Sequence, residues 1–444
     1  MNLFWKRLFG KLQSTERYEE EKKQLLADFN RYAAVRESDL MKEYNELTEK
    51  VKSADFQANK NALTSRKYKD TEEYRDMRKF EKLVADRDIV RFYEIQKNGT
   101  LAEYLAFKQK PDAAKLNDAK AVKESPELTR LKNFENSDDY KLYLRLNDSY
   151  IIKEYEELKA KVNTADFKQR NDFWSNPKRY ETTEEYRKEQ RLAEISKNPD
   201  IVFFLKCNYK RFAFIDNFQE VFDDHFAYQK LKDGAWKPGF RYISDQLKSV
   251  HSFLNERQAN NGGKNVQLNG ALVINTKAEK MQAPAWHPAR GFVMKDYDYT
   301  SDVINGYDAI HTNKGLFRAK MRFTGSNNVC HAFWLVGDHK TPHINVIKNN
   351  GGKLEVGVYY NANGNIQYTH EIIKGINPEK WYYYEVEWND NSLVWYINNL
   401  EVFRTSAVVP NEDLFPMFNS FIPDAMTGGN ATLEVDHVQV FKLK

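Results

Sequence analysis

The side chains best suited to chemistry lie in one short segment, His331–Lys348. It contains His331, His339 and His343, and imidazole nitrogens bind metal ions or transfer protons near neutral pH. Histidines that are exposed, or hydrogen-bonded in a core, are the plainer interpretation. Residues 339–348 contain no carboxylate that could form a general acid–base pair. The segment therefore predicts a polar site without by itself predicting catalysis.

Two strands must position these side chains. The apolar, aromatic run Phe333–Val336 is typical of a strand with a buried face, and Gly337 closes it. A polar loop with Pro342 follows, and alternation then predicts a second strand over residues 343–348. One face of that strand carries Ile344 and Val346, and the other carries His343, Asn345 and Ile347.

Further strand-like segments follow one another over residues 215–444. They include FDDHF (222–226), NGALVI (269–274), KGLFRAKMRF (314–323), WYYYEVEW (381–388), LVWYINNLEV (393–402) and VDHVQVF (435–441). Short β-rich runs spaced by turn residues predict an antiparallel sandwich. The segments and their order, over about residues 222–444, resemble glycoside hydrolase family 16, whose fold is a concanavalin A-like jelly roll.

The resemblance places the family's catalytic motif, roughly E-I-D-I-x-E, at HINVIK. In that family the first Glu is the nucleophile, the Asp tunes it and the last Glu is the acid/base. A retaining glycosidase needs two carboxyls about 5 Å apart. This chain has His343, Asn345 and Lys348 at those positions. An imidazole cannot form the glycosyl ester and a cation repels an oxocarbenium-like transition state, so the resemblance implies a jelly roll without its hydrolytic residues.

Ligand-binding candidates follow from the same resemblance and from exposure. The family's tryptophan in the preceding strand lies in the sugar cleft, which makes Trp334 a candidate platform, with a place in the core as the alternative. Trp286, in the turn-like stretch Pro284–Pro288, is a second candidate. Aromatic rings suit the apolar faces of sugars. Asp436 matches a position that many members use for a structural calcium ion, and no other cofactor is implied.

Residues 15–214 are predicted to be helical throughout and to contain a duplication. One helical face consists of Leu40, Tyr44, Leu47 and Val51, and it recurs as Ile151, Tyr155, Leu158 and Val162. The offset is 111 (155 − 44), and TEEYR at 71–75 recurs at 183–187, one residue further on. The copies, about 28–95 and 139–207, predict capped antiparallel helices in a bundle or short solenoid. We recognise no family in this half and assign it no chemistry.

Composition limits the classes of function. The 444 residues include 68 basic and 64 acidic side chains, which are interspersed and give a net charge of only +4, so nucleic acid is not a predicted partner. Aromatic residues make up 14%, which argues against disorder. Cys207 and Cys330 are predicted to be buried thiols in a reducing compartment. No run of 18 apolar residues predicts a transmembrane helix.

Residues 1–14 predict a short amphipathic helix. Its apolar side comprises Phe4, Trp5, Leu8, Phe9 and Leu12, and its basic residues are Lys6, Arg7 and Lys11. Such a helix can make weak contact with a membrane surface through residues 1–12, or dock on its own protein or a neighbouring subunit. The basic residues interrupt the apolar region that a secretory signal needs. The sequence therefore favours a cytoplasmic location, with membrane association as an option.

The sequence thus predicts a multidomain α plus β chain: a helix at 1–14, a duplicated all-α domain at 15–214 and a β-sandwich (jelly roll) at 215–444. The favoured function is a non-catalytic binding or scaffold module, with a glycan, a protein or a second copy of the chain as partner. The alternatives are an active endo-glycosidase on a β-glucan or related polysaccharide, and a peripheral membrane scaffold anchored by residues 1–12.

Overall fold

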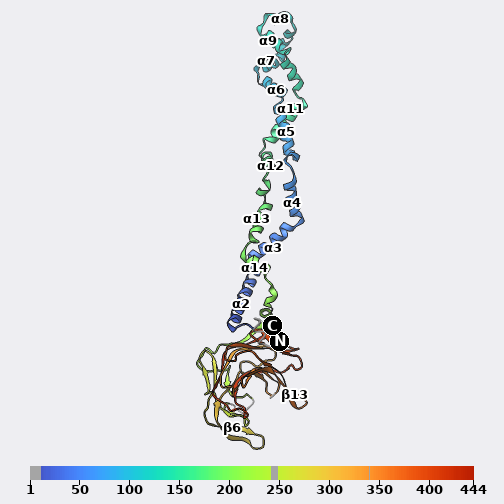
Figure 1. The fold of residues 1–444 in the computed structure, drawn as a ribbon. Coiled ribbons are helices and arrows are strands. Elements are labelled where there is room, and N and C mark those ends of the chain that lie inside the picture. The colour runs from blue at the N-terminus through green and yellow to red at the C-terminus, as the bar shows by residue number, and fades with distance from the viewer. Residues whose placement is uncertain (1–11, 242–248, 340) are drawn as a thin grey trace. The chain divides into compact units, whose positions relative to one another are not determined.

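The computed structural model describes residues 12–241, 249–339 and 341–444, with helices followed by strands along the chain (Figure 1). Two compact units make up the chain. One contains the residues up to Arg31 together with 207–444, and the other contains 32–206. The division falls inside helix α2 (Thr15–Glu37), whereas the boundaries drawn from the sequence lie at 14/15 and 214/215.

The unit of residues 32–206 is entirely helical. After the end of α2 its α-helices are α3 (Asp39–Lys52), α4 (Ala54–Ser65), α5 (Glu72–Val84), α6 (Arg87–Lys97), α7 (Gly99–Lys108), α8 (Ala119–Glu124), α9 (Pro126–Glu135), α10 (Asp138–Leu146), α11 (Tyr150–Val162), α12 (Ala165–Ser175), α13 (Glu184–Ile195) and α14 (Pro199–Lys206). Short 3-10 helices are η1 (Tyr68–Asp70), η2 (Pro111–Asn117) and η3 (Arg179–Thr182). The chain runs out along α3–α7 and returns along α11–α14 (Figure 1).

The two sequence copies fold into the same order of elements and pack on each other reciprocally. Helix α3 of the first copy contacts α13 of the second. The equivalent contact joins α5 of the first copy to α11 of the second, because α3 corresponds to α11 and α5 corresponds to α13. Ion pairs repeat in the same way: Arg191 binds Glu43 across α13 and α3, and Lys79 binds Glu154 across α5 and α11. The two ion pairs are equivalent: Lys79 of the first copy corresponds to Arg191 of the second (79 + 112 = 191), and Glu43 of the first corresponds to Glu154 of the second (43 + 111 = 154). The duplication therefore produces a pseudo-twofold arrangement inside the helical unit.

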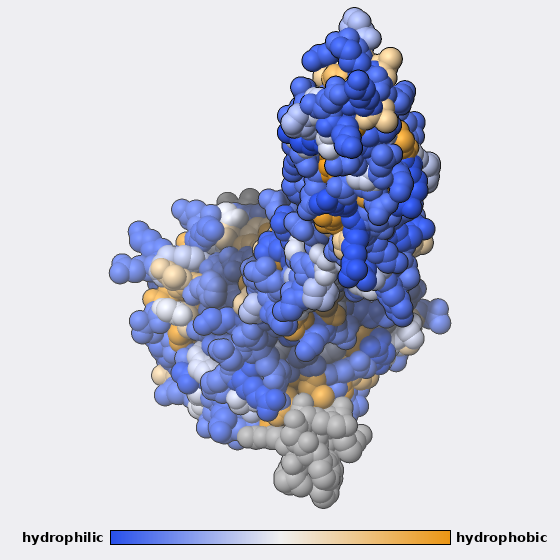
Figure 2. All heavy atoms as spheres, turned by 90° about the horizontal axis from the view of Figure 1, so that it is seen from above, coloured by the Kyte–Doolittle hydropathy of each residue, from blue (hydrophilic) through white to orange (hydrophobic). Residues whose placement is uncertain are grey.

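Hydroxyl side chains set where the equivalent helices begin. Ser38 and Ser149 accept a hydrogen bond from the third backbone N–H of α3 and α11, and Thr71 and Thr183 do the same for α5 and α13. Each such cap is worth about 1 kcal/mol because it satisfies a backbone donor that the helix leaves unpaired. The face drawn in Figure 2 is mostly hydrophilic, with scattered hydrophobic side chains.

Residues 218–443 form the predicted antiparallel sandwich, which follows η4 (Tyr209–Phe212) and α15 (Ala213–Asn217). One sheet has the order β17 (Leu400–Thr405), β16 (Leu393–Ile397), β15 (Tyr382–Trp388), β10 (Gly315–Gly325), β19 (Ala431–Leu443), β5 (Leu272–Thr276) and β4 (Val266–Leu268), and β1 (Phe218–Asp224) also pairs with β19. The other has the order β14 (Asn365–Ile373), β13 (Lys353–Ala362), β12 (His343–Asn350), β11 (Cys330–Val336), β18 (Phe415–Phe421), β9 (Val303–Asn305) and β2 (Lys237–Pro238). Two further strand pairs lie outside the large sheets. Strand β3 (Gln258–Asn260) pairs in parallel with β8 (Tyr299–Ser301), and β6 (Met281–His287) pairs in antiparallel fashion with β7 (Gly291–Tyr297). The fold class predicted from the sequence is confirmed.

One core fills the space between the two large sheets. Phe317 and Trp388 contribute from the eight-stranded sheet, and Phe333 and Leu335 contribute from the seven-stranded sheet, all fully buried. Side chains on the opposite face of β11, such as Trp334, belong to a second cluster. Alternation along β11 therefore aims one set of residues at the core and the other at the outer face of the seven-stranded sheet.

Leu12 and Thr15, at the beginning of the described residues, pack on the sandwich. Leu12 joins the sandwich core, and Thr15 Oγ1 donates a hydrogen bond to the Trp381 carbonyl oxygen at 2.5 Å. Of the helix predicted over residues 1–14, residues 1–11 lie outside the described residues, and only 12–14 can be compared with the prediction. Residues 12–14 are not helical, because the chain bends there before α2 begins. That part of the prediction is wrong.

The two cysteines are free thiols. Cys330 is buried as predicted, and burial raises the pKa of its thiol to about 11. Cys207 is only half-buried, which the sequence did not predict. Among the described residues, none of the helices combines the length and the apolar character that crossing a membrane requires.

Candidate functional site

A β-bulge in β12 determines which side chains of HINVIK share a face. Phe333 pairs with Ile347, but the next residue of β11, Trp334, pairs with Asn345, so Val346 is an extra residue. The extra residue resets the alternation. Ile347 consequently points into the sandwich core, and the prediction that it shares a face with His343 and Asn345 is wrong. Lys348 takes the place on that face instead.

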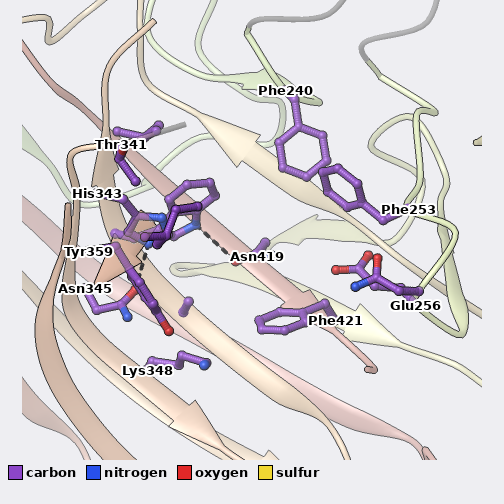
Figure 3. Close-up of a pocket in the computed structure, with 15 residues that line it drawn as sticks. Phe240, Phe253, Glu256, Thr341, His343, Asn345, Lys348, Tyr359, Asn419 and Phe421 are labelled. Atoms are coloured by element: carbon purple, nitrogen blue, oxygen red, sulfur yellow. Dashed lines mark hydrogen bonds between the residues drawn. The ribbon is translucent and has the colours of Figure 1, made fainter. Parts of the chain in front are cut away.

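The three residues at the degenerate motif positions, His343, Asn345 and Lys348, all line one cavity of about 470 Å³ (Figure 3). The cavity lies on the outer face of the seven-stranded sheet, on strands β11, β12, β13, β14 and β18. Loop residues Phe240, Phe253 and Glu256 face the strand residues from the other side (Figure 3). A cavity of this size, with aromatic walls and few polar groups, is typical of a small-ligand site.

A hydrogen-bond chain fixes His343 as a neutral ring. Asn345 Nδ2 donates to the Tyr368 hydroxyl at 3.1 Å, so its Oδ1 is the acceptor for His343 Nε2 at 2.9 Å. Burial lowers the pKa of His343 to about 4. The imidazole therefore carries its proton on Nε2 at neutral pH and leaves Nδ1 as an acceptor. Such a ring can accept a hydrogen bond from a ligand but is a weak base.

Trp334 forms part of the cavity wall. Its ring is 8% exposed and stacks on His343 with centroids 4.3 Å apart. Its Nε1 donates to Asn419 Oδ1 at 3.1 Å, which fixes the orientation of the indole. Tyr359 lies beside His343, with ring centroids 5.3 Å apart. Trp334 thus faces the cavity rather than the core between the sheets.

Lys348 is neutralised by a partner that the sequence did not reveal. Its Nζ lies 2.9 Å from Glu355 Oε1, on the paired position of strand β13. The side chains are 16% and 11% exposed, so the pair is largely shielded from water. Because Glu355 is held by this ammonium, it is not a second free carboxylate. An acid at a paired position on a neighbouring strand becomes visible only when the register is known.

Glu256 is a cavity residue that sequence reasoning missed. It lies on the loop side of the cavity, and Gln258 Nε2 donates to its Oε2 at 2.6 Å. Burial raises the pKa of Glu256 to about 7. At neutral pH this carboxyl is therefore partly protonated and can donate or accept a hydrogen bond. Its local sequence, LNERQ, carries no signal of this role.

The remaining predicted residues lie outside the cavity. Trp286 is 53% exposed, and it lies in strand β6 and not in a turn. Pro284 is compatible with a strand here because β6 belongs to a two-stranded ribbon, where one edge needs no backbone donor. His331 is buried against Ser420, with Nδ1 2.7 Å from Oγ, and His339 is exposed. Neither histidine lines the cavity with His343, and the three do not form a metal site among the described residues.

Asp436 lies beside an ammonium group. Lys320 Nζ is 3.1 Å from Asp436 Oδ2 and 2.9 Å from Glu19 Oε1. Calcium takes six to eight oxygen ligands. A lysine between the two carboxylates does not fit such a site, and we derive no role for calcium from Asp436. The calcium assignment stays a prediction.

Comparison with known proteins places the resemblance in the sandwich. Residues 271–423 match the model of the glycosyl hydrolases family 16. Two curated proteins of Rhizobium meliloti (strain 1021) are similar. The endo-1,3-1,4-beta-glycanase EglC is 23% identical over 249 residues, and ExsH, of the same description, is 22% identical over 245. Each match covers 50% of this chain and 52% of the relative, so the chain spans about half the length of these relatives. The C-terminal half of the chain resembles family 16.

Solved structures match the same half of the chain. The catalytic domain of an endo-1,3-beta-glucanase (laminarinase) from Thermotoga petrophila RKU-1 is 15% identical, with a TM-score of 0.41, covering 51% of this chain and 99% of that one. LamAcat from Zobellia galactanivorans is 18% identical, with a TM-score of 0.41 and coverages of 50% and 98%. The kappa-carrageenase of Pseudoalteromonas carrageenovora is 15% identical, with a TM-score of 0.40 and coverages of 51% and 96%.

Proposed function

We propose that the sandwich binds a glycan in the Trp334 cavity and does not hydrolyse it. The observation that carries the proposal is the set of groups around the cavity. Among the described residues that line it, Glu256 is the only carboxyl group. Hydrolysis by a retaining or an inverting glycosidase requires two carboxyls flanking the scissile bond. The other nearby acid, Glu355, is paired with Lys348.

The same cavity has the groups that a sugar needs. The rings of Trp334 and Tyr359 provide apolar faces, and the amide of Asn419 and the imidazole of His343 provide polar atoms. Sugars present apolar ring faces together with hydroxyl groups, so this combination suits them better than a purely apolar ligand. The family relatives named as glycanases and glucanases make a β-glucan the first ligand to test.

The first prediction is the absence of turnover. We expect the full chain, at micromolar concentration, to release no reducing ends above background from laminarin, lichenan, agarose or porphyran over a day. An active laminarinase serves as the positive control. The physical reason is that neutral His343 cannot form a glycosyl ester and no second carboxyl is available to activate water. Turnover that disappears in Glu256→Gln would overturn the proposal.

An endo-glycosidase remains the second candidate, and Glu256 is the observation that favours it. A carboxyl with a pKa of about 7 can serve as a general acid at neutral pH. This function would also need a base or nucleophile, and the lining residues offer only His343, whose pKa of about 4 makes it weak. Stereochemical analysis of any product would separate an inverting from a retaining reaction.

Trp286 is proposed to extend the ligand platform. The ring of Trp286 contacts Phe292 at 5.1 Å, Phe292 lies 5.8 Å from His251, and His251 lies 5.1 Å from Phe253, which lines the cavity. These centroid distances describe a continuous row of rings from the exposed hairpin to the cavity. His251 itself is buried, so a long oligosaccharide would pass over it and contact the exposed rings of Phe292 and Trp286, whereas a short one would remain inside the cavity.

The second prediction uses ligand length. We expect Trp286→Ala to weaken binding of a long β-glucan oligosaccharide about threefold to tenfold, the usual worth of one aromatic contact, and to leave a disaccharide unaffected. Isothermal titration with a length series checks this. Tyr150→Ala is the matched control, because Tyr150 is an aromatic residue of the helical unit that is 77% exposed. Equal losses for all lengths, or none, would contradict the extended platform.

A further inference from the structure

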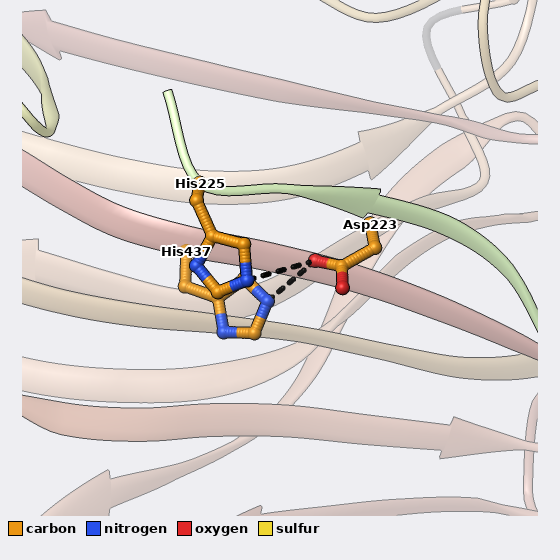
Figure 4. A group of neighbouring side chains, drawn as sticks. All are labelled: Asp223, His225 and His437. Carbon is orange, nitrogen blue, oxygen red and sulfur yellow. Dashed lines mark hydrogen bonds and ion pairs between the residues drawn. The ribbon is translucent and has the colours of Figure 1, made fainter. Parts of the chain in front are cut away.

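Two histidines and an aspartate meet on the eight-stranded sheet, away from the glycan cavity. The potential ligand atoms of Asp223, His225 and His437 all lie within 4.8 Å of one another (Figure 4). His437 Nε2 is 2.6 Å from Asp223 Oδ1, and His225 Nε2 is 3.5 Å from the same oxygen. The two imidazole rings stack with centroids 3.7 Å apart. Side chains from β19 and from the end of β1 therefore converge on one point.

The backbone around the cluster is firmly anchored. Asp224, between Asp223 and His225, is buried and accepts hydrogen bonds from the Phe226 N–H at 2.8 Å and from Trp236 Nε1 at 2.9 Å. Phe226 is fully buried. Two buried residues on either side of His225 thus hold its backbone, although its own side chain is 61% exposed. Ligands on an anchored backbone lose little freedom when an ion binds.

The donor set selects a class of metal. Two imidazole nitrogens and one carboxylate oxygen suit zinc and neighbouring transition metals, whereas calcium and magnesium prefer oxygen ligands alone. His437 is 7% exposed, and its Nε2 is held 2.6 Å from Asp223 Oδ1. A neutral ring is the form that binds a metal. The cluster therefore resembles a three-ligand site with a fourth position open to water.

We propose that Asp223, His225 and His437 form a zinc site on the eight-stranded sheet. Because a carboxylate oxygen only accepts hydrogen bonds, Asp223 Oδ1 accepts from Nε2 of His437 at 2.6 Å, and Nε2 of His225 lies 3.5 Å away. Binding requires the Nε2 lone pairs, so each ring shifts its proton to Nδ1 and turns toward the ion. The exposed side chain of His225 allows that movement. Asp436, the neighbour of His437, is not part of this site because Lys320 holds it.

A metal at this position would join the first strand of the sandwich to the last. Strand β1 pairs with β19 from Phe218–Leu443 to Asp224–Val438, and the cluster lies at the far end of that pairing. A bulge between Glu220 and Phe222 interrupts the β1–β19 ladder. An ion held by both strands would oppose separation of β1 beyond this irregularity, so the proposed role is structural and independent of glycan binding.

The experiment titrates Zn²⁺ into the full-length, untagged chain after dialysis against a chelator, with calorimetry as the readout. Co²⁺ in a parallel titration reports ligand geometry through its absorption bands. The variants are His225→Ala and Asp223→Asn, and the matched control is His339→Ala, another exposed histidine. Far-UV circular dichroism checks that each variant is folded. We avoid changing His437 because it is buried.

We expect one Zn²⁺ to bind per chain. Either variant should lower the Zn²⁺ affinity at least about tenfold, because losing one of three ligands costs at least as much as losing a group that orients a ligand. The affinity of His339→Ala should be unchanged. Excess Ca²⁺ should not compete. Three results would overturn the proposal: no saturable binding, the same affinity in His225→Ala and Asp223→Asn as in the unchanged chain, or loss of binding in His339→Ala. In each case the cluster would be a hydrogen-bonded group and nothing more.

Discussion

Replacing Trp334 with alanine is expected to weaken glycan binding at least about thirtyfold, the largest loss for any single substitution in the cavity. The indole lines the cavity, its face stacks on His343 and its Nε1 is held by Asn419. Removing it deletes both the apolar platform and the group that orients the amide. Losses of 2 kcal/mol or more are typical of a buried aromatic anchor. Isothermal titration with the best ligand from a glycan array would measure the change.

Stability must be separated from binding in this test, because Trp334 is 8% exposed and truncating such a residue costs about 3–5 kcal/mol. Trp334→Phe keeps an aromatic ring but removes the Nε1 donor together with the five-membered part of the indole, so we expect a folded chain with an intermediate affinity. Asn419→Ala keeps the whole indole but removes both the partner of Nε1 and an amide that lines the cavity, so it too should weaken binding, by less than Trp334→Ala. Unchanged affinity in a folded Trp334→Ala chain would show that the indole is only a packing residue.

Much of the sandwich could be predicted from local pattern. Strands β16 (Leu393–Ile397) and β17 (Leu400–Thr405) lie at the predicted segment 393–402, and the motif HINVIK proved to be a strand beside β11. Alternation and turn residues are local properties, so they can be read without knowing what pairs with what. The same holds for the duplicated helices, whose caps Ser38 and Ser149 recur at the same offset.

What could not be predicted depends on contacts between distant residues. One extra residue in β12 moves Ile347 to the core and Lys348 to the cavity, and a bulge has no sequence signature here. Glu355 reaches Lys348 because of strand register, and Glu256 enters the cavity from a loop almost one hundred residues earlier. The electrostatics of a site are therefore the last property that a single sequence reveals.

The packing of helix α2 on the sandwich also depends on contacts between distant residues, and breaking it is expected to cost as much stability as Trp334→Ala. Its residue Tyr18 donates to Glu385 Oε1 at 2.7 Å, and Arg318 Nη1 lies 3.6 Å from Glu385 Oε2. The side chains of Arg318 and Glu385 are each 5% exposed. Arg318 Nη2 also donates to Gln439 at 2.6 Å. A buried charge pair thus lies where α2 meets the eight-stranded sheet.

Arg318→Met is expected to destabilise the sandwich by about 3–5 kcal/mol, because it leaves the Glu385 carboxylate buried without a countercharge. Urea unfolding followed by tryptophan fluorescence reports on this unit, since six of the eight tryptophans lie between residues 236 and 395. The matched control is Arg404→Met. Its partner Glu401 is three residues away and both side chains are about half exposed, so the loss should stay below about 0.5 kcal/mol.

A second variant decides whether the charge or the packing of Arg318 is responsible. In Arg318→Met with Glu385→Leu no charge remains buried, and we expect most of the lost stability to return, as happens when a buried ion pair is replaced by apolar residues of similar volume. Tyr18 would then lack its acceptor, so recovery should be incomplete by about 1 kcal/mol. If the double variant were as unstable as Arg318→Met, the stacking of the guanidinium on Phe441, 4.7 Å from the ring centroid, would be the interaction that matters. The buried pair would then be a consequence of how α2 packs and not its cause.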